Sequence, residues 1–189
     1  VICADGIHSA AREQMYPNEG APIYSGRLLW RATSVAKPYL SGASMIMAGY
    51  EDQKFVCYPI EKERADGLQR INWVAELRRP LPKREQGWSR EGRIDDFLPQ
   101  FADWRFDWLD VPGLMRSAER IYEYPMVDRN PVPTWNRGCV TLLGDSAHPM
   151  YPIGSNGASQ AILDVQALVL ALDRADSVAE GLAQYEQAR

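Results

Sequence analysis

The sequence predicts an α/β fold, more narrowly α+β over these residues, in which two segments of a strand–loop–helix domain flank an antiparallel sheet. Two observations predict it. A short apolar run at 139–143 is followed by a loop rich in proline and glycine and then by a long helical pattern. The middle of the chain instead alternates apolar and polar residues in short runs separated by turns, which is typical of antiparallel strands.

Composition is that of a globular protein and excludes several classes of function. The 189 residues carry a net charge of −4, and no basic block indicates a nucleic-acid partner. No apolar run approaches the roughly 20 residues that span a bilayer, so no membrane partner is expected. Three widely spaced cysteines and two histidines indicate neither a disulfide framework nor a metal site. We therefore expect a reducing, cytoplasmic location.

The stretch 138–172 predicts a ligand site at the N-terminus of a helix. Asp145 lies just past the carboxyl end of the predicted strand, where ligands bind in open α/β sheets. Asn156 is the predicted helix cap, and Gly154 and Gly157 keep side-chain bulk away from the backbone. The helix itself is predicted by apolar residues at three- and four-residue steps, namely Ala158, Ala161, Ile162, Val165, Leu168, Val169 and Leu172.

This stretch resembles the GD motif of the FAD-dependent aromatic hydroxylases, the single-component flavoprotein monooxygenases. The resemblance rests on Gly144-Asp145-Ser146-Ala147-His148-Pro149, Pro152-x-Gly154-x-x-Gly157 and Ala161-Ile162-x-Asp164. The glycine-rich loop and its helix are most similar to the phenazine-hydroxylase branch. Near the N-terminus, Ala4-Asp5-Gly6 with Ser9 and Arg12 resembles the DG motif of the same family, in the family's order. Ser9 is also the predicted cap of a short helix.

The resemblance implies FAD as cofactor and suggests which residues bind it. Asp5 and Gly6 would lie near the pyrophosphate, and Asp145 would accept a hydrogen bond from the ribitol chain. Pro152, the one catalytic candidate, would shape the loop beside the reactive edge of the flavin through its carbonyl and its rigidity. The remaining implied cofactor-binding residues are Arg12, Gly144, Pro149, Gly154, Ser155, Asn156 and Gly157. For Arg12 an equal alternative is a salt bridge that braces the short helix.

The same resemblance divides the chain into three segments. Residues 1–26 and 129–189 are expected to belong to a Rossmann-like FAD domain, and residues 27–128 to a substrate domain whose sheet roofs the flavin. Arg31 is the candidate substrate-binding residue, with a solvent-facing strand arginine as the alternative. The predicted strands are 27–35, 44–50, 54–60, 70–77 and 117–127, with a helical insert near 94–101 that Ser89 could cap. Four tryptophans could line an aromatic pocket or the core, Trp73, Trp88, Trp104 and Trp108.

The activity that the resemblance implies is hydroxylation of a small aromatic or heteroaromatic substrate. O2 would be the oxidant, acting through a flavin C4a-hydroperoxide, and NADH or NADPH would supply the electrons. Two alternatives stay open: another FAD-dependent oxidoreductase on this fold, such as a reductase, and a cofactor-free ligand-binding module. No metal is expected. The sequence names neither the substrate nor the oligomeric state.

One expected fingerprint of the family is missing. No Gly-x-Gly-x-x-Gly follows a strand, and in this family that motif lies near the N-terminus. Strand and helix patterns also run to the two ends of the sequence. We therefore expect this chain to be the C-terminal part of a longer enzyme, and to bind FAD poorly or not at all by itself because the adenosine half of the site is missing.

Overall fold

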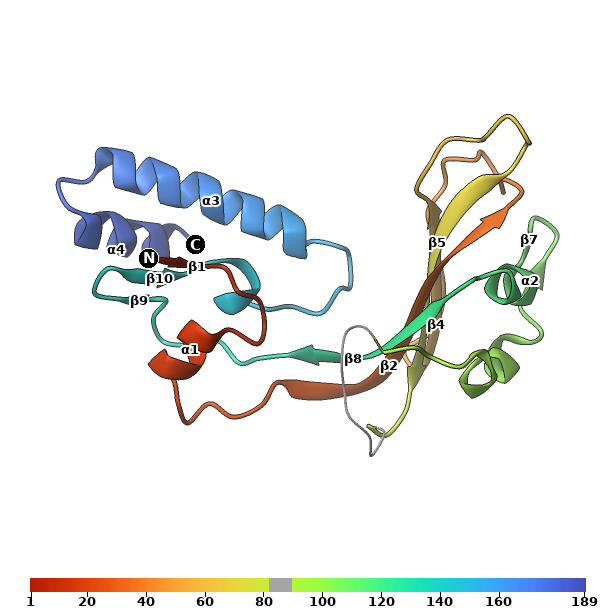
Figure 1. Cartoon of the computed structure of the whole chain (residues 1–189), viewed down its shortest axis with the longest axis horizontal. Coiled ribbons are helices and arrows are strands. Elements are labelled where there is room, and N and C mark those ends of the chain that lie inside the picture. The colour runs from red at the N-terminus through yellow and green to blue at the C-terminus, as the bar shows by residue number, and fades with distance from the viewer. Residues whose placement is uncertain (82–89) are drawn as a thin grey trace. The chain divides into compact units, whose positions relative to one another are not determined.

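The computed structural model describes residues 1–81 and 90–189, which form two compact units (Figure 1). Unit 1 comprises residues 1–25 and 127–189, and unit 2 comprises residues 26–126. Unit 1 is therefore built from two segments distant in the sequence, whereas unit 2 is continuous. The suggestions made for Trp88 and Ser89 lie outside the described residues.

Unit 1 contains a small three-stranded sheet. β1 (Ile2–Cys3) pairs in parallel with β10 (Val140–Leu142), and β10 pairs antiparallel with β9 (Asn136–Arg137). The apolar run at 139–143 thus forms the predicted strand. The short helix α1 (Ala10–Met15) begins at Ser9, whose hydroxyl accepts a hydrogen bond from the N–H of Arg12, and this confirms the predicted cap.

Two C-terminal helices complete unit 1. α3 (Gly157–Arg174) and α4 (Val178–Ala188) pack against each other and against the end of β10. Where they meet, the hydroxyl of Tyr185 donates to the carbonyl of Leu142 at 3.3 Å. The buried apolar residues of this core are Leu143, Leu168, Ala171, Leu182 and Tyr185.

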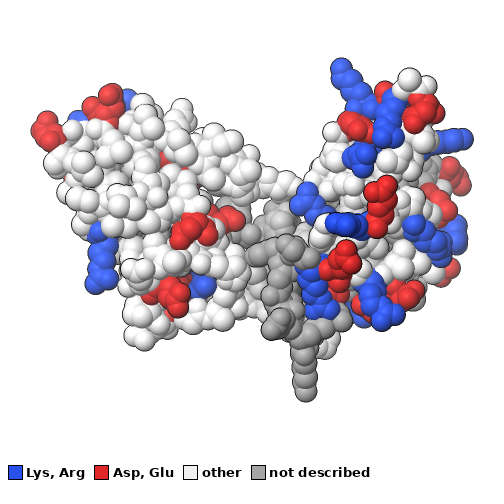
Figure 2. Space-filling view, viewed as in Figure 1, with Lys and Arg blue, Asp and Glu red and all other residues white. Residues whose placement is uncertain are grey.

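The helical period of α3 is confirmed, but the apolar positions that predict the helix do not mark its buried side. That side carries Asp164, Leu168 and Ala171. The large apolar side chains exposed on α3 are Ile162, Leu163, Val165, Val169, Leu170 and Leu172. The atoms over α3 are accordingly mostly uncharged in Figure 2. Because α3 is apolar almost all round, periodicity alone does not select the side that packs.

We expect these exposed side chains to make the 189-residue chain self-associate. Replacing Val165 and Val169 together with lysine should reduce light scattering and the fluorescence of a hydrophobic dye. The free energy of unfolding should change by less than about 0.5 kcal/mol at each site, because both valines are at least half exposed, 50% and 59%. Leu168→Lys is the contrasting variant, since Leu168 is 3% exposed and its replacement should unfold unit 1. A double variant that scatters as strongly as the parent would contradict the expectation.

Unit 2 is built on a five-stranded sheet in the order β3-β4-β5-β2-β8. The pairings of β3 with β4, β4 with β5 and β5 with β2 are antiparallel, as predicted. All five predicted strands are present, with shifted ends: β2 (Ile23–Ala36), β3 (Ile46–Gly49), β4 (Gln53–Pro59), β5 (Gln69–Arg78) and β8 (Ile121–Asp128).

One face of this sheet carries the hydrophobic core of unit 2. Trp30 and Trp73 are almost fully buried, and Phe97 stacks on Trp30 with ring centroids 4.9 Å apart. The indole N–H of Trp73 donates to the hydroxyl of Ser34 at 2.9 Å, which satisfies its one polar group. Trp73 is thus a core residue, whereas Trp108 is 39% exposed.

The segment between β5 and β8 differs from the prediction in detail. The helical insert forms two 3₁₀ helices, Ile94–Asp96 and Leu98–Phe101, because Pro99 cannot donate the hydrogen bond that an α-helix needs inside its length. A short hairpin of β6 (Arg105–Phe106) and β7 (Leu109–Asp110) leads into α2 (Val111–Arg116), where no helix was predicted. Within the described residues, no helix has both the length and the apolar character required to cross a membrane.

Candidate functional site

The chain leaves β10 through a tight turn that requires glycine. Gly144 has φ +62°, and a Cβ at this position would lie 3.3 Å from the Cβ of Ala161 on α3. The N–H groups of Ala147 and His148 both donate to the carbonyl of Gly144, at 2.8 and 2.9 Å. A side chain at residue 144 would be strained and crowded at once, so Gly144 shapes the turn through its backbone.

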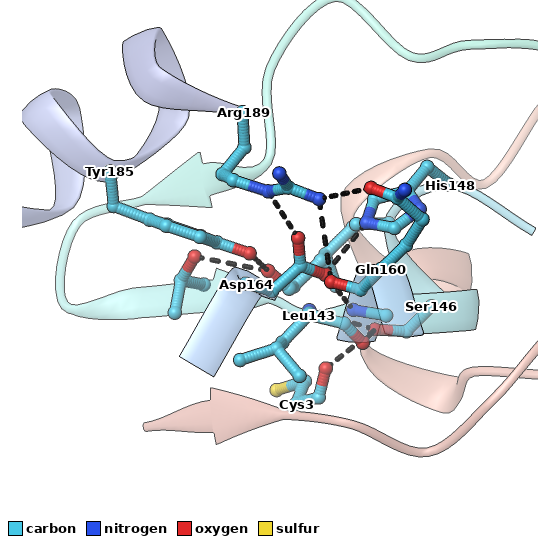
Figure 3. A network of polar contacts seen from close by, with 12 residues as sticks. Cys3, Leu143, Ser146, His148, Gln160, Asp164, Tyr185 and Arg189 are labelled. Atoms are coloured by element: carbon cyan, nitrogen blue, oxygen red, sulfur yellow. Dashed lines mark hydrogen bonds and ion pairs between the residues drawn. The ribbon is translucent and has the colours of Figure 1, made fainter. Parts of the chain in front are cut away.

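A buried carboxylate on α3 holds this turn in place (Figure 3). Oδ2 of Asp164 accepts a hydrogen bond from the N–H of Gly144 at 2.8 Å and lies 2.7 Å from Nε2 of His148. Its Oδ1 accepts from Nε of Arg189 at 2.6 Å. The His148 ring also packs on Trp135, with centroids 5.0 Å apart. The His148 side chain is therefore held in place by Asp164 and Trp135.

The hydroxyl of Ser146 joins the same turn to β1. Ser146 is fully buried, and its Oγ accepts from the N–H of Leu143 at 3.0 Å and lies 2.5 Å from the carbonyl oxygen of Cys3. The turn is thus tied to α3 through Asp164 and to the sheet through Ser146. Because Gly144 and Ser146 are both held in this way, the direction of the backbone at residue 145 is fixed.

Asp145 itself is exposed and lies beside the first residue of α3. Its Oδ1 would be 3.9 Å from a Cβ built on Gly157. Asn156 occupies the N-cap position, but its side chain makes no capping hydrogen bond, so the predicted side-chain cap is wrong. The reason is its backbone, with φ −92° and ψ −13°, which is helical where a capping residue is normally extended. The first N–H groups of α3 therefore receive no capping hydrogen bond from the side chain of Asn156.

The loop between the turn and α3 presents its backbone openly. Gly154 and Ser155 have φ +85° and +55°, two successive left-handed residues. The N–H of Ser155 donates to the carbonyl of Pro152 at 3.2 Å. Pro152, Gly154 and Ser155 are exposed, and Pro149 is half-buried. A left-handed serine costs about 1 kcal/mol or more, a strain found most often at functional sites.

The Ala4-Asp5-Gly6 motif lies just before α1, and its carboxylate binds the first residue of that helix. Oδ2 of Asp5 accepts a hydrogen bond from the N–H of Ala10 at 2.9 Å. Burial raises the pKa of Asp5, but hydrogen bonds from Ser9 and from backbone N–H groups outweigh it and hold the pKa below its usual range. Gly6 has φ +79°. Asp5 is thus an exposed carboxylate whose side chain is already engaged with the start of α1.

Arg12 is buried and makes hydrogen bonds with all five of its N–H groups. Nε and Nη2 bind the carboxylate of Glu19 at 2.6 to 3.2 Å. Nη1 donates to the carbonyls of Ser146 and Ala147 at 3.0 and 2.7 Å, and Nη2 also donates to the carbonyl of Asn130 at 2.8 Å. No donor is left for a cofactor. The structure therefore favours the bracing alternative for Arg12 over the predicted role in cofactor binding.

The ion pair of Arg12 should make stability depend on pH. The hydrogen bond from Arg12 is the largest influence on Glu19 and lowers its pKa below the ordinary value of 4.5, while burial acts in the opposite direction. Because the folded-state pKa is the lower one, the stabilisation is complete above about pH 4.5 and is lost as the pH falls through the folded-state pKa. We expect Glu19→Gln to flatten the decline of the unfolding free energy between pH 5 and pH 3, roughly the range of carboxylate titration, in urea titrations. An unchanged decline would contradict this role.

Arg31, the predicted substrate-binding residue, lies in unit 2. It is exposed on β2, and its Nε donates to Oδ1 of Asn72 at 3.1 Å. Among the residues that the structure describes, no group of three or more His, Cys, Asp or Glu side chains is arranged to hold a metal ion.

The comparison with known families agrees with the geometry of unit 1. The model of the family described as FAD binding domain matches residues 1–189. This chain belongs to that FAD-binding family. It is 44% identical over 195 residues to the phenazine 1,6-dicarboxylic acid hydroxylase PhzS of Lysobacter antibioticus, covering 100% of this chain and 47% of that protein. It is 34% identical over 193 residues to the 3-amino-4-hydroxybenzoate 2-monooxygenase PtnB3 of Streptomyces platensis, covering 100% and 46%. The chain spans about half the length of these relatives.

Solved structures of the FAD-binding family share the fold. HpxO of Klebsiella pneumoniae, in complex with FAD and uric acid, superposes with a TM-score of 0.77 at 22% identity, covering 100% of this chain and 46% of that one. A salicylate hydroxylase in its substrate complex gives 0.76 at 24% identity, covering 100% and 50%. The predicted fold class and the resemblance to FAD-dependent aromatic hydroxylases are thereby confirmed.

Proposed function

We propose that this chain serves in an FAD-dependent monooxygenase that hydroxylates an aromatic or heteroaromatic substrate. The observation that carries the proposal is the start of α3, a helix N-terminus without a side-chain cap, preceded by an exposed glycine-serine loop and flanked by the carboxylate of Asp145. Backbone N–H groups and the positive end of the dipole of an 18-residue helix favour a negatively charged ligand at this place.

The residues present fit a flavin. Asp145 is exposed and offers acceptor atoms to a hydroxyl of the ribitol chain. The uncapped N–H groups at residues 157–159 offer donors to the pyrimidine edge of the ring, where reduced flavin carries negative charge. Gly154 and Ser155 leave the backbone open to a planar group. Asp5, Gly6, Pro149 and Pro152 are proposed to complete the cofactor site.

Each part of this chain would then have a defined task. FAD, when bound, supplies the redox chemistry, in which two electrons from NADH or NADPH reduce O2, one oxygen atom enters the substrate ring and the other leaves as water. The N-terminus of α3 stabilises negative charge on the cofactor. Pro152 limits the conformations of the loop, and Asp164 and Ser146 hold the turn that presents Asp145.

The names of the relatives support an aromatic substrate. PhzS is named for phenazine 1,6-dicarboxylic acid and PtnB3 for 3-amino-4-hydroxybenzoate, both of them aromatic acids. The proposal includes NADH or NADPH as reductant and a cytoplasmic location.

The decisive experiment uses the protein extended to the length of its relatives. Its visible absorbance reports bound flavin, and NADH and NADPH oxidation is then followed with O2 consumption against a panel of phenolic and phenazine acids. Bound flavin with substrate-stimulated O2 uptake and incorporation of oxygen from labelled O2 into product is the expected result. Flavin without O2 uptake would favour a reductase, and a colourless, folded protein would favour a ligand-binding module.

Removing the carboxylate of Asp145 should weaken FAD binding. We expect Asp145→Ala in the extended protein to raise the Kd for FAD about tenfold, since one hydrogen bond is worth about 0.5–1.5 kcal/mol. Fluorescence titration of the apoprotein measures it. Asp173→Ala, which removes another exposed carboxylate, at the far end of α3, is the matched control and should leave the Kd unchanged. Equal effects of the two variants would contradict the role of Asp145.

A further inference from the structure

A hollow lies at one end of the unit 2 sheet, where β4 ends and β5 begins. Its volume is about 570 Å³, and it is lined by two turns, residues 41–43 before β3 and residues 59–63 after β4. The two turns come together beside the start of β5 (Figure 1), and Gln69, the first residue of that strand, completes the lining.

The first turn is held in a conformation that its residues do not prefer. Leu40 has φ +47°, in the left-handed region that bulky side chains rarely adopt, and its side chain does not pack there, since it is 61% exposed. The N–H of Gly42 donates to the carbonyl of Tyr39 at 2.9 Å, and the hydroxyl of Tyr39 donates to the carbonyl of Ser44 at 2.6 Å. These bonds fix the wall that the turn gives to the hollow.

The amide of Gln69 joins the two turns. Gln69 is 2% exposed, and its Nε2 donates to the carbonyls of Gly42 and Glu61 at 2.8 and 2.9 Å. Because both partners are carbonyl oxygens, the nitrogen of the amide must face them, and this fixes the orientation of the side chain. Its Oε1 is then left without a hydrogen-bond partner among the described residues. A buried acceptor without a donor is rare in native proteins and asks for an explanation.

The lining also offers a carboxylate that is not neutralised. Oε1 of Glu61 lies 3.0 Å from Nε of Arg64, which balances its charge. Glu63 is exposed and forms no ion pair within the part of the chain that the structure describes. The neighbouring Lys62 is also exposed, and its long side chain can extend into solvent. A ligand with a positive charge and N–H donors would therefore have an acceptor in Gln69 and a counter-charge in Glu63.

The remaining wall of the hollow is apolar. Pro59 and Ile60 form it on one side and Ala43 on the other, and Ile60 is 50% exposed. A short alkyl chain lying on these residues would remove apolar surface from water on both partners. The acceptor, the carboxylate and the apolar wall together suit an aliphatic amine in its ammonium form.

We propose that this hollow binds the ammonium group of a small aliphatic amine, with Gln69 and Glu63 as acceptors and with Pro59 and Ile60 against its alkyl chain. The inference goes beyond the proposed function. All residues proposed for FAD belong to unit 1, whereas the hollow is lined by unit 2 alone. The amine would thus be a second ligand, distinct from the cofactor.

The test compares two cations, butylammonium and butyltrimethylammonium, which share a charge and an alkyl chain but differ in N–H donors. Their Kd values are measured by NMR titration of the extended protein at constant ionic strength. We expect butylammonium to bind with a Kd of about 1–10 mM, which is normal for a ligand of so few atoms. The trimethylated cation should bind at least about fivefold more weakly, because it cannot donate to Gln69.

Two variants locate the binding. Gln69→Met removes the acceptor and should weaken butylammonium binding about tenfold, while binding of the trimethylated cation changes less than about twofold. Glu63→Gln removes an exposed charge, so it should leave the fold intact and weaken both cations about two- to fivefold. Glu119→Gln is the matched control, since it removes an exposed carboxylate of unit 2 outside the hollow, and it should change neither Kd.

Equal affinity for the two cations, or unchanged binding in Glu63→Gln, would overturn the inference. Gln69→Met also removes the donors to Gly42 and Glu61, so thermal unfolding checks its fold. If that variant does not fold, the two cations and Glu63→Gln still decide the matter. The measurements should give the same result with and without bound flavin, so their failure would leave the monooxygenase proposal untouched.

Discussion

Arg12→Met is expected to reduce the free energy of unfolding by about 3–5 kcal/mol, the range for breaking one side of a buried ion pair. Arg12 is 1% exposed and uses all five of its N–H groups in hydrogen bonds inside unit 1, including those to the carbonyls of Ser146 and Ala147. Methionine fills similar space but leaves these carbonyls without a donor, and it leaves Glu19 with Arg129 as its remaining cation. Urea denaturation monitored by circular dichroism measures the loss.

Two further variants make the Arg12 prediction specific. Arg12→Lys should recover little of the loss, because an ammonium group has three donors and cannot span the same acceptors. Arg174→Met removes an exposed arginine at the end of α3 and should cost less than about 0.5 kcal/mol. A loss below about 1 kcal/mol for Arg12→Met would show that the network does not brace unit 1.

Asp164→Ala is expected to cost about 3 kcal/mol and to disturb the proposed flavin site together with the fold. Asp164 is fully buried and accepts from Gly144 and Arg189 while it binds His148. Alanine leaves the N–H of Gly144 without an acceptor. The turn that presents Asp145 then loses its tie to α3.

Thermal unfolding and FAD titration of the extended protein measure the two effects of Asp164→Ala separately. Asp164→Asn keeps the shape and one carbonyl acceptor, so it should lose about half as much stability. Asp173→Ala, on the exposed side of the same helix, should change neither quantity. If Asp164→Ala lowers stability but leaves the Kd for FAD unchanged, Asp164 supports the fold alone.

The strands of unit 2 could be predicted because alternation reports a local property, the exposure of successive side chains on two faces of a sheet. The side of α3 that packs against α4 could not be predicted. Its buried side includes the charged Asp164, and its apolar residues surround most of the helix, so no pattern within α3 indicates which side meets α4. The helix α2 escaped prediction because Pro112 and Gly113 lie inside it, and both residues weaken a helical pattern.

The residues of the candidate site could be named from the sequence, but not all of their partners. Motif residues such as Gly144 and Asp145 could be named from their order in the sequence, and the structure places them beside the start of α3. The tasks of Arg12 and Asp164 depend on partners far away, since Arg12 and Ser146 are 134 positions apart. For Asp164 the available signal was a carboxylate within an apolar helix, which must be paired if it is buried. The partner of Arg31, Asn72, follows only from the pairing of β2 with β5.

The pairing of β1 with β10 has a consequence for the order of folding. These strands lie at opposite ends of a loop, and the N–H of Thr141 donates to the carbonyl of Val1, 140 positions away. Closing so long a loop in an unfolded chain is slow and entropically unfavourable. Because β2 and β8 are neighbours in the sheet of unit 2, formation of that sheet draws residues 25 and 127 together and shortens the effective loop. Unit 2 should thus fold first, and its sheet should bring the two segments of unit 1 together, both in refolding and during synthesis on the ribosome.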